Sequence, residues 1–127
     1  MRQAGIIAAA GLVALDTMVE RLREDHENAR RLAAGLAKID GVRVDLDTVQ
    51  TNIVNFDISA TGRTVPAFLA ELEKRGVKAM ERDVGPVVRM VTHRHVSRND
   101  VDETLDAVRD VVGAKAAKGL RQSSQTR

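Results

Sequence analysis

An uncharged, mostly apolar and alanine-rich run at Ala4–Leu15 leaves few ways to fold this chain. A helix that is apolar on nearly every side must be buried on nearly every side. A domain of 127 residues has little room for that, so we expect the helix to contact another subunit or a further domain. The run ends at Asp16 and is shorter than the roughly 20 residues that a membrane-spanning helix needs. A secretory signal is disfavoured because only Arg2 is basic before the run and no clean cleavage site precedes Asp16.

Charge and composition argue against a nucleic-acid partner. The formal net charge is +2, which is too small to attract nucleic acid by bulk electrostatics. Phe56 and Phe68 are the only Phe, Tyr or Trp residues, so bases have no series of rings on which to stack. The chain has no cysteine, which excludes a disulfide framework and a thiolate metal site. This composition fits a reducing compartment, and we expect a cytoplasmic protein without a membrane partner.

Apolar periodicity predicts three further helices and four short strands. Alternation predicts strands at residues 42–46 and 54–58, and two short runs at residues 77–80 and 87–92 are also expected to be strands. Helical spacing predicts helices at residues 19–36, 64–76 and 97–113. Gly41 and Gly76 are expected to end the first two of these helices. Ser97 with Asp100 is expected to cap the last one.

The order of these elements predicts the fold class. Strands that follow each other directly pair as hairpins, so the sheet should be small and mainly antiparallel, with the helices packed on one face. The predicted fold is therefore a two-layer α+β arrangement. We expect one domain over residues 1–113, followed by a polar tail at residues 114–127 that lacks an apolar stripe and is disordered.

Arg89 is the strongest candidate for a binding residue. It stands in the middle of a predicted strand between valines, and we expect it on an apolar face of the sheet. An unpaired charge is costly to bury, so the guanidinium needs a partner. Its planar fork suits a bound carboxylate or phosphate. A structural ion pair with Asp57 or Glu81 would satisfy it equally well, and both interpretations stay open.

The other polar residues near Arg89 are less informative. His93 and His95 would point the same way on a strand, but two ligands without a third do not make a metal site, and we expect none. Arg94 and Arg98 extend a short basic segment that either attracts an anion or is solvated surface. Arg2 either reaches an anion in a neighbouring unit or is a terminal charge in solvent. No nucleophile–base pair or phosphate loop is present, so we assign no catalytic residue.

Two longer stretches carry a family resemblance. The first is MRQAGIIAAAG at residues 1–11, continuing through LREDHENA at residues 22–29. The second is TVQTNIV at residues 48–54, followed by VRMVTH at residues 88–93 and VSR at residues 96–98. In residue identity, order and spacing these stretches resemble the C-terminal small-domain part of low-specificity L-threonine aldolases, in the β-eliminating lyase family. The resemblance runs from residue 1 to about residue 113.

The resemblance implies a fold type I enzyme, in which a large domain holds pyridoxal phosphate through a lysine and a small C-terminal domain closes over the site. It implies cleavage of threonine or allo-threonine to glycine and acetaldehyde, with the cofactor as electron sink. The position matching Arg89 binds the substrate carboxylate. The position matching Arg2 lies near the cofactor phosphate and the subunit interface. The helix at Ala4–Leu15 would belong to the core of a homo-oligomer.

Departures from the family pattern change what we expect of this chain alone. The Gly-rich stretch that precedes the matched methionine in the family is not among these residues. None of the five lysines of this chain matches the cofactor position. They are Lys38, Lys74, Lys78, Lys115 and Lys118. His95 stands where the family often has aspartate. We therefore expect this chain alone to bind no pyridoxal phosphate and to be inactive, and to act with a large domain that these residues do not include. Two non-catalytic interpretations stay open: a module that binds a small anion through Arg89, and an oligomerisation module built on the first helix.

Overall fold

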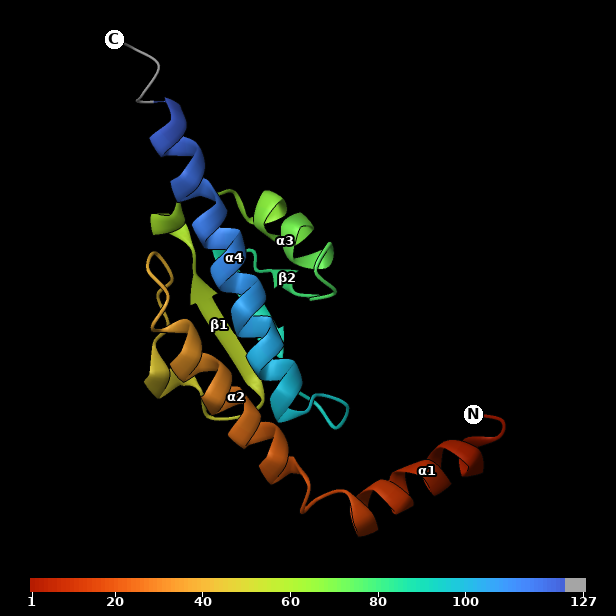
Figure 1. Cartoon of the computed structure of the whole chain (residues 1–127). Helices are drawn as coiled ribbons and strands as arrows, with labels where there is room; N and C mark the ends of the chain where they lie inside the picture. The colour runs from red at the N-terminus through yellow and green to blue at the C-terminus, as the bar shows by residue number, and fades with distance from the viewer. Residues whose placement is uncertain (123–127) are drawn as a thin grey trace.

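A small antiparallel sheet covered by helices on one face forms the body of the chain (Figure 1). The computed structural model describes residues 1–122, with side chains for residues 1–114. The strands are β1 (Ile53–Asp57), β2 (Met80–Glu81) and β3 (Val87–Val91), in the order β1-β3-β2 with antiparallel pairing throughout. The predicted α+β class with a mainly antiparallel sheet is confirmed.

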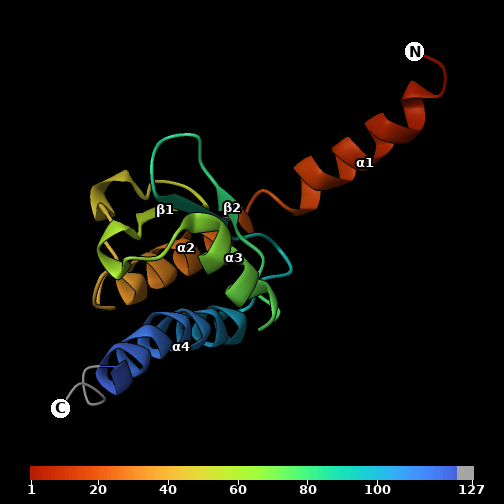
Figure 2. The same cartoon turned by 90° about the horizontal axis from the view of Figure 1, so that it is seen from above.

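Four α-helices occur in the described part of the chain. They are α1 (Ala4–Thr17), α2 (Leu22–Leu36), α3 (Val65–Glu73) and α4 (Arg98–Gln122), with short 3-10 turns η1 (Leu46–Thr48) and η2 (Ser59–Thr61). The helices α2 and α4 lie side by side, and α3 contacts both α4 and β2. Figure 2 shows the sheet on one side of the body and these three helices on the other. The expectation of helices on one face of the sheet holds for α2, α3 and α4.

The core lies between the sheet and these helices, and it follows from the two periodicities in the sequence. Alternate residues of β1 and β3 face the helices, where Val54, Phe56, Val88 and Met90 are buried. The Phe56 ring meets the ring of Phe68 from α3 edge-on, with centroids 6.3 Å apart. Every second residue of these strands therefore lies on the opposite face.

The strand predicted at residues 42–46 is wrong over most of its length. Only Arg43 pairs, exchanging two backbone hydrogen bonds of 2.9 Å with Asp57. The Asp45 carboxylate then accepts a hydrogen bond from the Asp47 backbone N–H at 3.2 Å, and the chain turns into η1. An aspartate that bonds the backbone two residues on favours a turn over a continuing ladder, which explains the early end of the strand.

The last helix is longer than predicted. The apolar stripe led us to expect its end at Gly113, whereas α4 continues to Gln122. A glycine inside a helix costs about 1 kcal/mol relative to alanine, and the Ala-Lys-Ala-Ala-Lys segment that follows has high helix propensity. Part of the expected polar tail is thus helical, and residues 123–127 lie outside the described residues.

The predicted apolar helix forms as α1, and the rest of the described chain leaves it uncovered. Figures 1 and 2 both show α1 extending away from the body. None of its residues is buried, and its large apolar side chains are 61–72% exposed: Ile6, Ile7, Leu12, Val13 and Leu15. No described helix combines the length and apolarity needed to cross a membrane. The all-round apolar surface expected from the sequence is therefore left uncovered by the described residues.

Candidate functional site

The face of the sheet turned away from the helices carries Arg89. We call this the open face, and it is made of Ile53, Asn55, Asp57, Met80, Val87, Arg89 and Val91, with Arg43 and Arg82 at one end. Val88 and Met90 point to the core, so Arg89 between them points outward. The expected apolar surroundings are only partly present, because Arg89 is half-buried beside polar residues of β1.

Asn55 lies directly opposite Arg89 across β1 and β3. The Thr92 backbone N–H donates to the Asn52 carbonyl at 2.9 Å, which makes residues 52 and 92 a hydrogen-bonded pair. Hydrogen-bonded and non-hydrogen-bonded pairs alternate along an antiparallel ladder, so the pair three positions further, Asn55 and Arg89, is non-hydrogen-bonded. In such pairs the side chains come closest to each other.

Both members of this pair have a buried polar atom without a partner. Arg89 Nε and Asn55 Oδ1 are buried and make no hydrogen bond within the part of the chain whose side chains are described. Neither Asp57 nor Glu81 forms an ion pair with Arg89 among the described residues, so the structural ion pair that the sequence left open is not made. Buried polar groups almost always have partners. A buried donor facing a buried acceptor, both unpaired, therefore marks this position as a candidate ligand contact.

A shallow hollow of about 630 Å³ begins at Asn55 and runs along the open face towards Arg43 and Arg82. Asp57 also lines it. Hydrogen bonds from Ser59, and more weakly the positive charge of Arg43, lower the pKa of the Asp57 carboxyl below its usual value. The Ser59 backbone N–H donates to that carboxylate at 2.5 Å. The hollow thus has arginines at its rim and an acid already engaged by its own turn.

The basic segment after β3 does not join Arg89. The rings of His93 and His95 meet edge-on at 5.9 Å, and the His95 N–H donates to His93 Nδ1 at 3.3 Å. Arg94 and His95 line a separate hollow of about 390 Å³ beside α2. Arg98 pairs with Glu27 at 3.5 Å. Within residues whose side chains are described, no three His, Cys, Asp or Glu side chains gather as metal ligands would.

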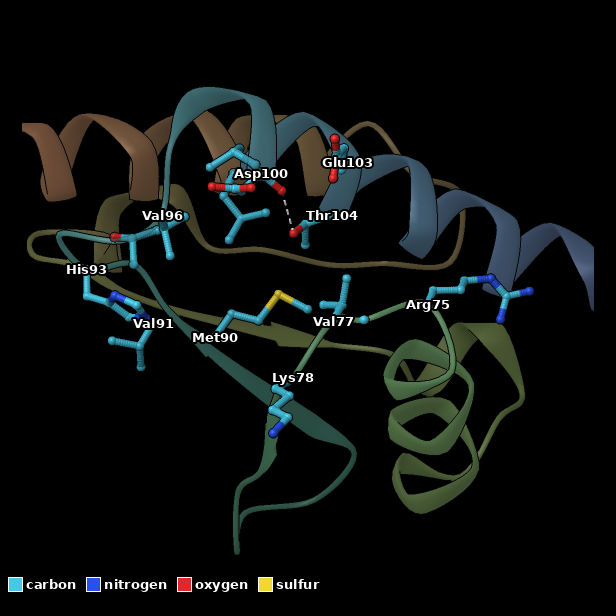
Figure 3. A pocket seen from close by; sticks show the side chains of 14 residues that line it. Arg75, Val77, Lys78, Met90, Val91, His93, Val96, Asp100, Glu103 and Thr104 are labelled. Carbon is cyan, nitrogen blue, oxygen red and sulfur yellow. Dashed lines mark hydrogen bonds between the residues drawn. The ribbon is translucent and has the colours of Figure 1, made fainter.

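Another pocket, of about 370 Å³, opens between α4 and the C-terminal end of β3. Figure 3 shows Val77, Lys78 and Met90 on the strand side, with Asp100 and Glu103 on α4. Successive strand residues point to opposite faces, so Met90 places this pocket on the helix side of the sheet. It shares Val91 with the open face but is not lined by Asn55 or Arg89.

A buried polar network holds the exit of β3, and sequence reasoning missed it. The Thr92 hydroxyl donates to the Asp25 carbonyl of α2 at 2.6 Å, and Asn52 Nδ2 donates to the Thr92 carbonyl at 2.7 Å. Asn28 Nδ2 donates to the Val96 carbonyl at 2.9 Å. Asn28 and Thr92 are the buried polar residues of the described side chains. Their only sequence signal is a polar residue within an apolar pattern.

Arg2 lies at the opposite end of the molecule from the sheet. It is exposed and precedes α1, whose N-terminal end is remote from the body in both views (Figures 1 and 2). The single chain therefore does not bring Arg2 to Arg89. Any role of Arg2 depends on what contacts α1.

Sequence comparisons agree with the resemblance carried by the two stretches. Residues 1–59 match the family model for beta-eliminating lyases. The chain is 36% identical over 106 residues to low-specificity L-threonine aldolase 1 of Arabidopsis thaliana, covering 83% of this chain and 29% of that protein. It is 41% identical over 113 residues to the probable low-specificity L-threonine aldolase 2 of the same plant, covering 83% and 30%. The low specificity L-threonine aldolase of Escherichia coli K12 is 38% identical over 105 residues, covering 81% and 28%.

The fold also has a solved counterpart. The structure of MppP soaked with the product 2-ketoarginine superposes with a TM-score of 0.61 at 19% identity, covering 78% of this chain and 30% of that one. This likeness shows that the α+β body of the chain folds like part of that protein. The sequence matches show that the chain is similar to β-eliminating lyases over residues 1–59 and to a stretch of low-specificity L-threonine aldolases over most of its length. It spans about 30% of the length of these curated relatives.

The lysines whose side chains are described lie away from Arg89. A pyridoxal phosphate site needs a lysine whose amine is free to bind the cofactor. Lys38 and Lys78 are exposed, and Lys74 forms an ion pair with Glu71 at 2.7 Å. None of these lysines lies on the part of the open face that surrounds Arg89. What this part of the chain offers is the open face with its unpaired guanidinium.

Proposed function

We propose that this chain is the substrate-carboxylate-binding part of a pyridoxal-phosphate-dependent threonine aldolase. The whole enzyme would cleave threonine or allo-threonine to glycine and acetaldehyde. The observation that carries the proposal is Arg89, whose half-buried guanidinium has no partner at Nε on the open face. Similarity to β-eliminating lyases and threonine aldolases supports lyase chemistry, and the unpaired Nε supports a substrate-binding role for this arginine.

A guanidinium suits this task because its planar fork can donate two parallel hydrogen bonds to one carboxylate. Placement on the middle strand of the sheet restricts its movement, since β3 is held on both sides by β1 and β2. A ligand bound in a fixed orientation reacts faster because its reacting bond is already aligned. The lysine that holds the cofactor would come from a large domain outside these residues.

The proposal gives α1 and Arg2 a role in assembly. Burying an exposed apolar helix of 14 residues is favourable in proportion to the apolar area removed from water. We propose that α1 packs against the large domain or another subunit of a homo-oligomer, and that Arg2 lies near the cofactor phosphate or the subunit interface. The cytoplasm is the proposed compartment, for which the absence of cysteine is the support.

A chimera tests the proposal. This chain would replace the matching 28% of the Escherichia coli enzyme, so that the relative supplies the rest. We expect the chimera to cleave L-threonine. We expect Arg89→Lys to raise KM and lower kcat, with kcat/KM falling about 100-fold, because a point charge cannot replace a bidentate fork. Arg82→Lys, an exposed arginine at the end of the same face, is the matched control and should change kcat/KM by less than about threefold.

Two results would contradict the proposal. The first is a chimera that is folded and loaded with cofactor but inactive, which would remove the aldolase assignment. The second is an active chimera in which Arg89→Lys behaves like Arg82→Lys, which would remove the carboxylate role of Arg89.

A non-catalytic small-anion-binding module is the second candidate. The arginines at the rim of the open-face hollow favour it, because Arg43 and Arg82 give the hollow positive charge without any catalytic group. An oligomerisation module built on α1 is the third, favoured by the exposed apolar helix. A chain that binds carboxylates or self-associates while the chimera stays inactive would favour these alternatives.

A further inference from the structure

Asn55 has no assigned role, yet its amide is the group closest in register to Arg89. We propose that Asn55 is a second ligand contact on the open face. Its Oδ1 would accept a hydrogen bond from a hydroxyl or ammonium group of the same ligand whose carboxylate Arg89 binds. This inference rests on the proposed function of Arg89 and adds the chemical class of ligand that the face selects.

The two unpaired atoms are complementary, since Arg89 Nε is a donor and Asn55 Oδ1 is an acceptor. They face each other in a non-hydrogen-bonded pair, the arrangement that brings cross-strand side chains closest. Even so, they do not bond to each other. A third group that accepts from one and donates to the other would satisfy both atoms.

The neighbouring side chains on the open face do not supply that group. Met80, which is opposite Arg89 on β2, has no N–H or O–H in its side chain. The Asp57 carboxylate is engaged by the Ser59 backbone. A bound ligand is therefore the group that could accept from Arg89 and donate to Asn55.

The chemistry of this pair distinguishes ligand classes. A plain carboxylate has only acceptor atoms, so it can satisfy Arg89 but leaves Asn55 Oδ1 facing further lone pairs. A carboxylate with a hydroxyl or ammonium on a nearby carbon can satisfy both. Leaving a buried acceptor unpaired costs more than a hydrogen bond gains, so the second class should bind more tightly. The hollow that begins at Asn55 has room for the rest of such a ligand.

Nuclear magnetic resonance on the ¹⁵N-labelled 127-residue chain tests this inference directly. The signals to follow are Arg89 Nε–H and the Asn55 side-chain amide, titrated with sodium acetate and with sodium lactate at equal ionic strength. We expect lactate to bind about tenfold more tightly than acetate, which corresponds to about 1.4 kcal/mol. Asn55→Leu keeps a side chain of similar size without its polar atoms and should reduce this ratio to near one.

Asn99→Leu is the matched control. Asn99 is an exposed asparagine on α4, where its Nδ2 donates to Glu103 at 2.7 Å. It does not lie on the open face, so the lactate-to-acetate ratio should stay near that of the unmutated chain. Unchanged backbone amide spectra would establish that both variants keep the fold.

The outcomes separate this inference from the proposed function. If Arg89 Nε–H responds to both ligands with equal affinity, and Asn55→Leu changes nothing, the selective role of Asn55 is overturned while Arg89 keeps its role. If Arg89 Nε–H responds to neither ligand, both proposals fail for this chain. A lactate preference that persists in Asn55→Leu would assign the second contact to another group and also overturn the inference.

Discussion

Replacing Thr92 by valine tests the buried network that anchors β3. The Thr92 side chain is 2% exposed, and its hydroxyl donates to the Asp25 carbonyl, 67 residues away in sequence, at 2.6 Å. Valine has nearly the same shape and suits a strand, so the change removes the hydrogen bond with little effect on packing. The Asp25 carbonyl belongs to α2 and can keep its intrahelical bond, which limits the penalty. We therefore expect a loss of about 1.5 kcal/mol in the free energy of unfolding.

Urea unfolding followed by circular dichroism measures this loss. For a chain of this size it corresponds to a fall in Tm of roughly 6 °C. Thr104→Val is the matched control, since its hydroxyl also donates to a backbone carbonyl, that of Asp100, at 2.7 Å, but locally within α4. That control should change stability by less than about 0.5 kcal/mol. Equal effects of the two substitutions, or no effect of Thr92→Val, would refute the reasoning that the non-local bond carries the stability.

Two further predictions concern a glycine and an acidic cap. Gly41 has φ +85°, and the Cβ of an alanine there would lie 3.2 Å from the Thr61 side chain. Gly41→Ala should therefore lower the free energy of unfolding by about 1 to 2 kcal/mol, measured in urea. Gly113 has open space around it, so the control Gly113→Ala should stabilise α4 by up to about 1 kcal/mol. A stable Gly41→Ala variant would contradict this. Hydrogen bonds from the Ser97 backbone and hydroxyl lower the pKa of Asp100, so its contribution is present above pH 4 or so and is lost as the pH falls through the lowered pKa. Asp100→Asn should therefore reduce Tm more at pH 7 than at pH 2, and an equal reduction at both pH values would argue against the charged cap.

The strands that carry the candidate site were predictable because their pattern is local. Residues 54–58 alternate in polarity, as a strand buried on one face requires, and residues 87–92 form a short, mostly apolar run that also favours a strand. The alternating directions of side chains along a strand placed Arg89 on the opposite face from Val88 and Met90. The β-eliminating lyase resemblance was likewise confirmed, because its residues can be read directly from the sequence.

The Asn55–Arg89 pairing could not be predicted, because it depends on register. Register is set by how the chain returns between β1 and β3, through α3 and the short strand β2, and a slip of one residue would have turned Asn55 to the core. The strand expected at residues 42–46 failed for a different reason. There a side-chain bond from Asp47 N–H to Asp45 outweighs alternation, and such local competition is invisible to periodicity.

For α1, the sequence predicted that the helix has to be covered, but not which surface covers it. An all-round apolar helix has to be covered, but the covering surface is not in the described chain. The proposed roles of α1 and Arg2 therefore depend on a larger assembly, in which a large domain supplies the cofactor lysine.

The central claim is that this chain works within a longer pyridoxal-phosphate enzyme. Intact mass spectrometry of the protein from its native cells, after borohydride reduction, tests that claim most directly. Because the chain spans 28–30% of its relatives, we predict a mass about three times 13.8 kDa, increased by one covalently fixed pyridoxyl group. A native mass of 13.8 kDa without that group would contradict the account and favour a non-catalytic module.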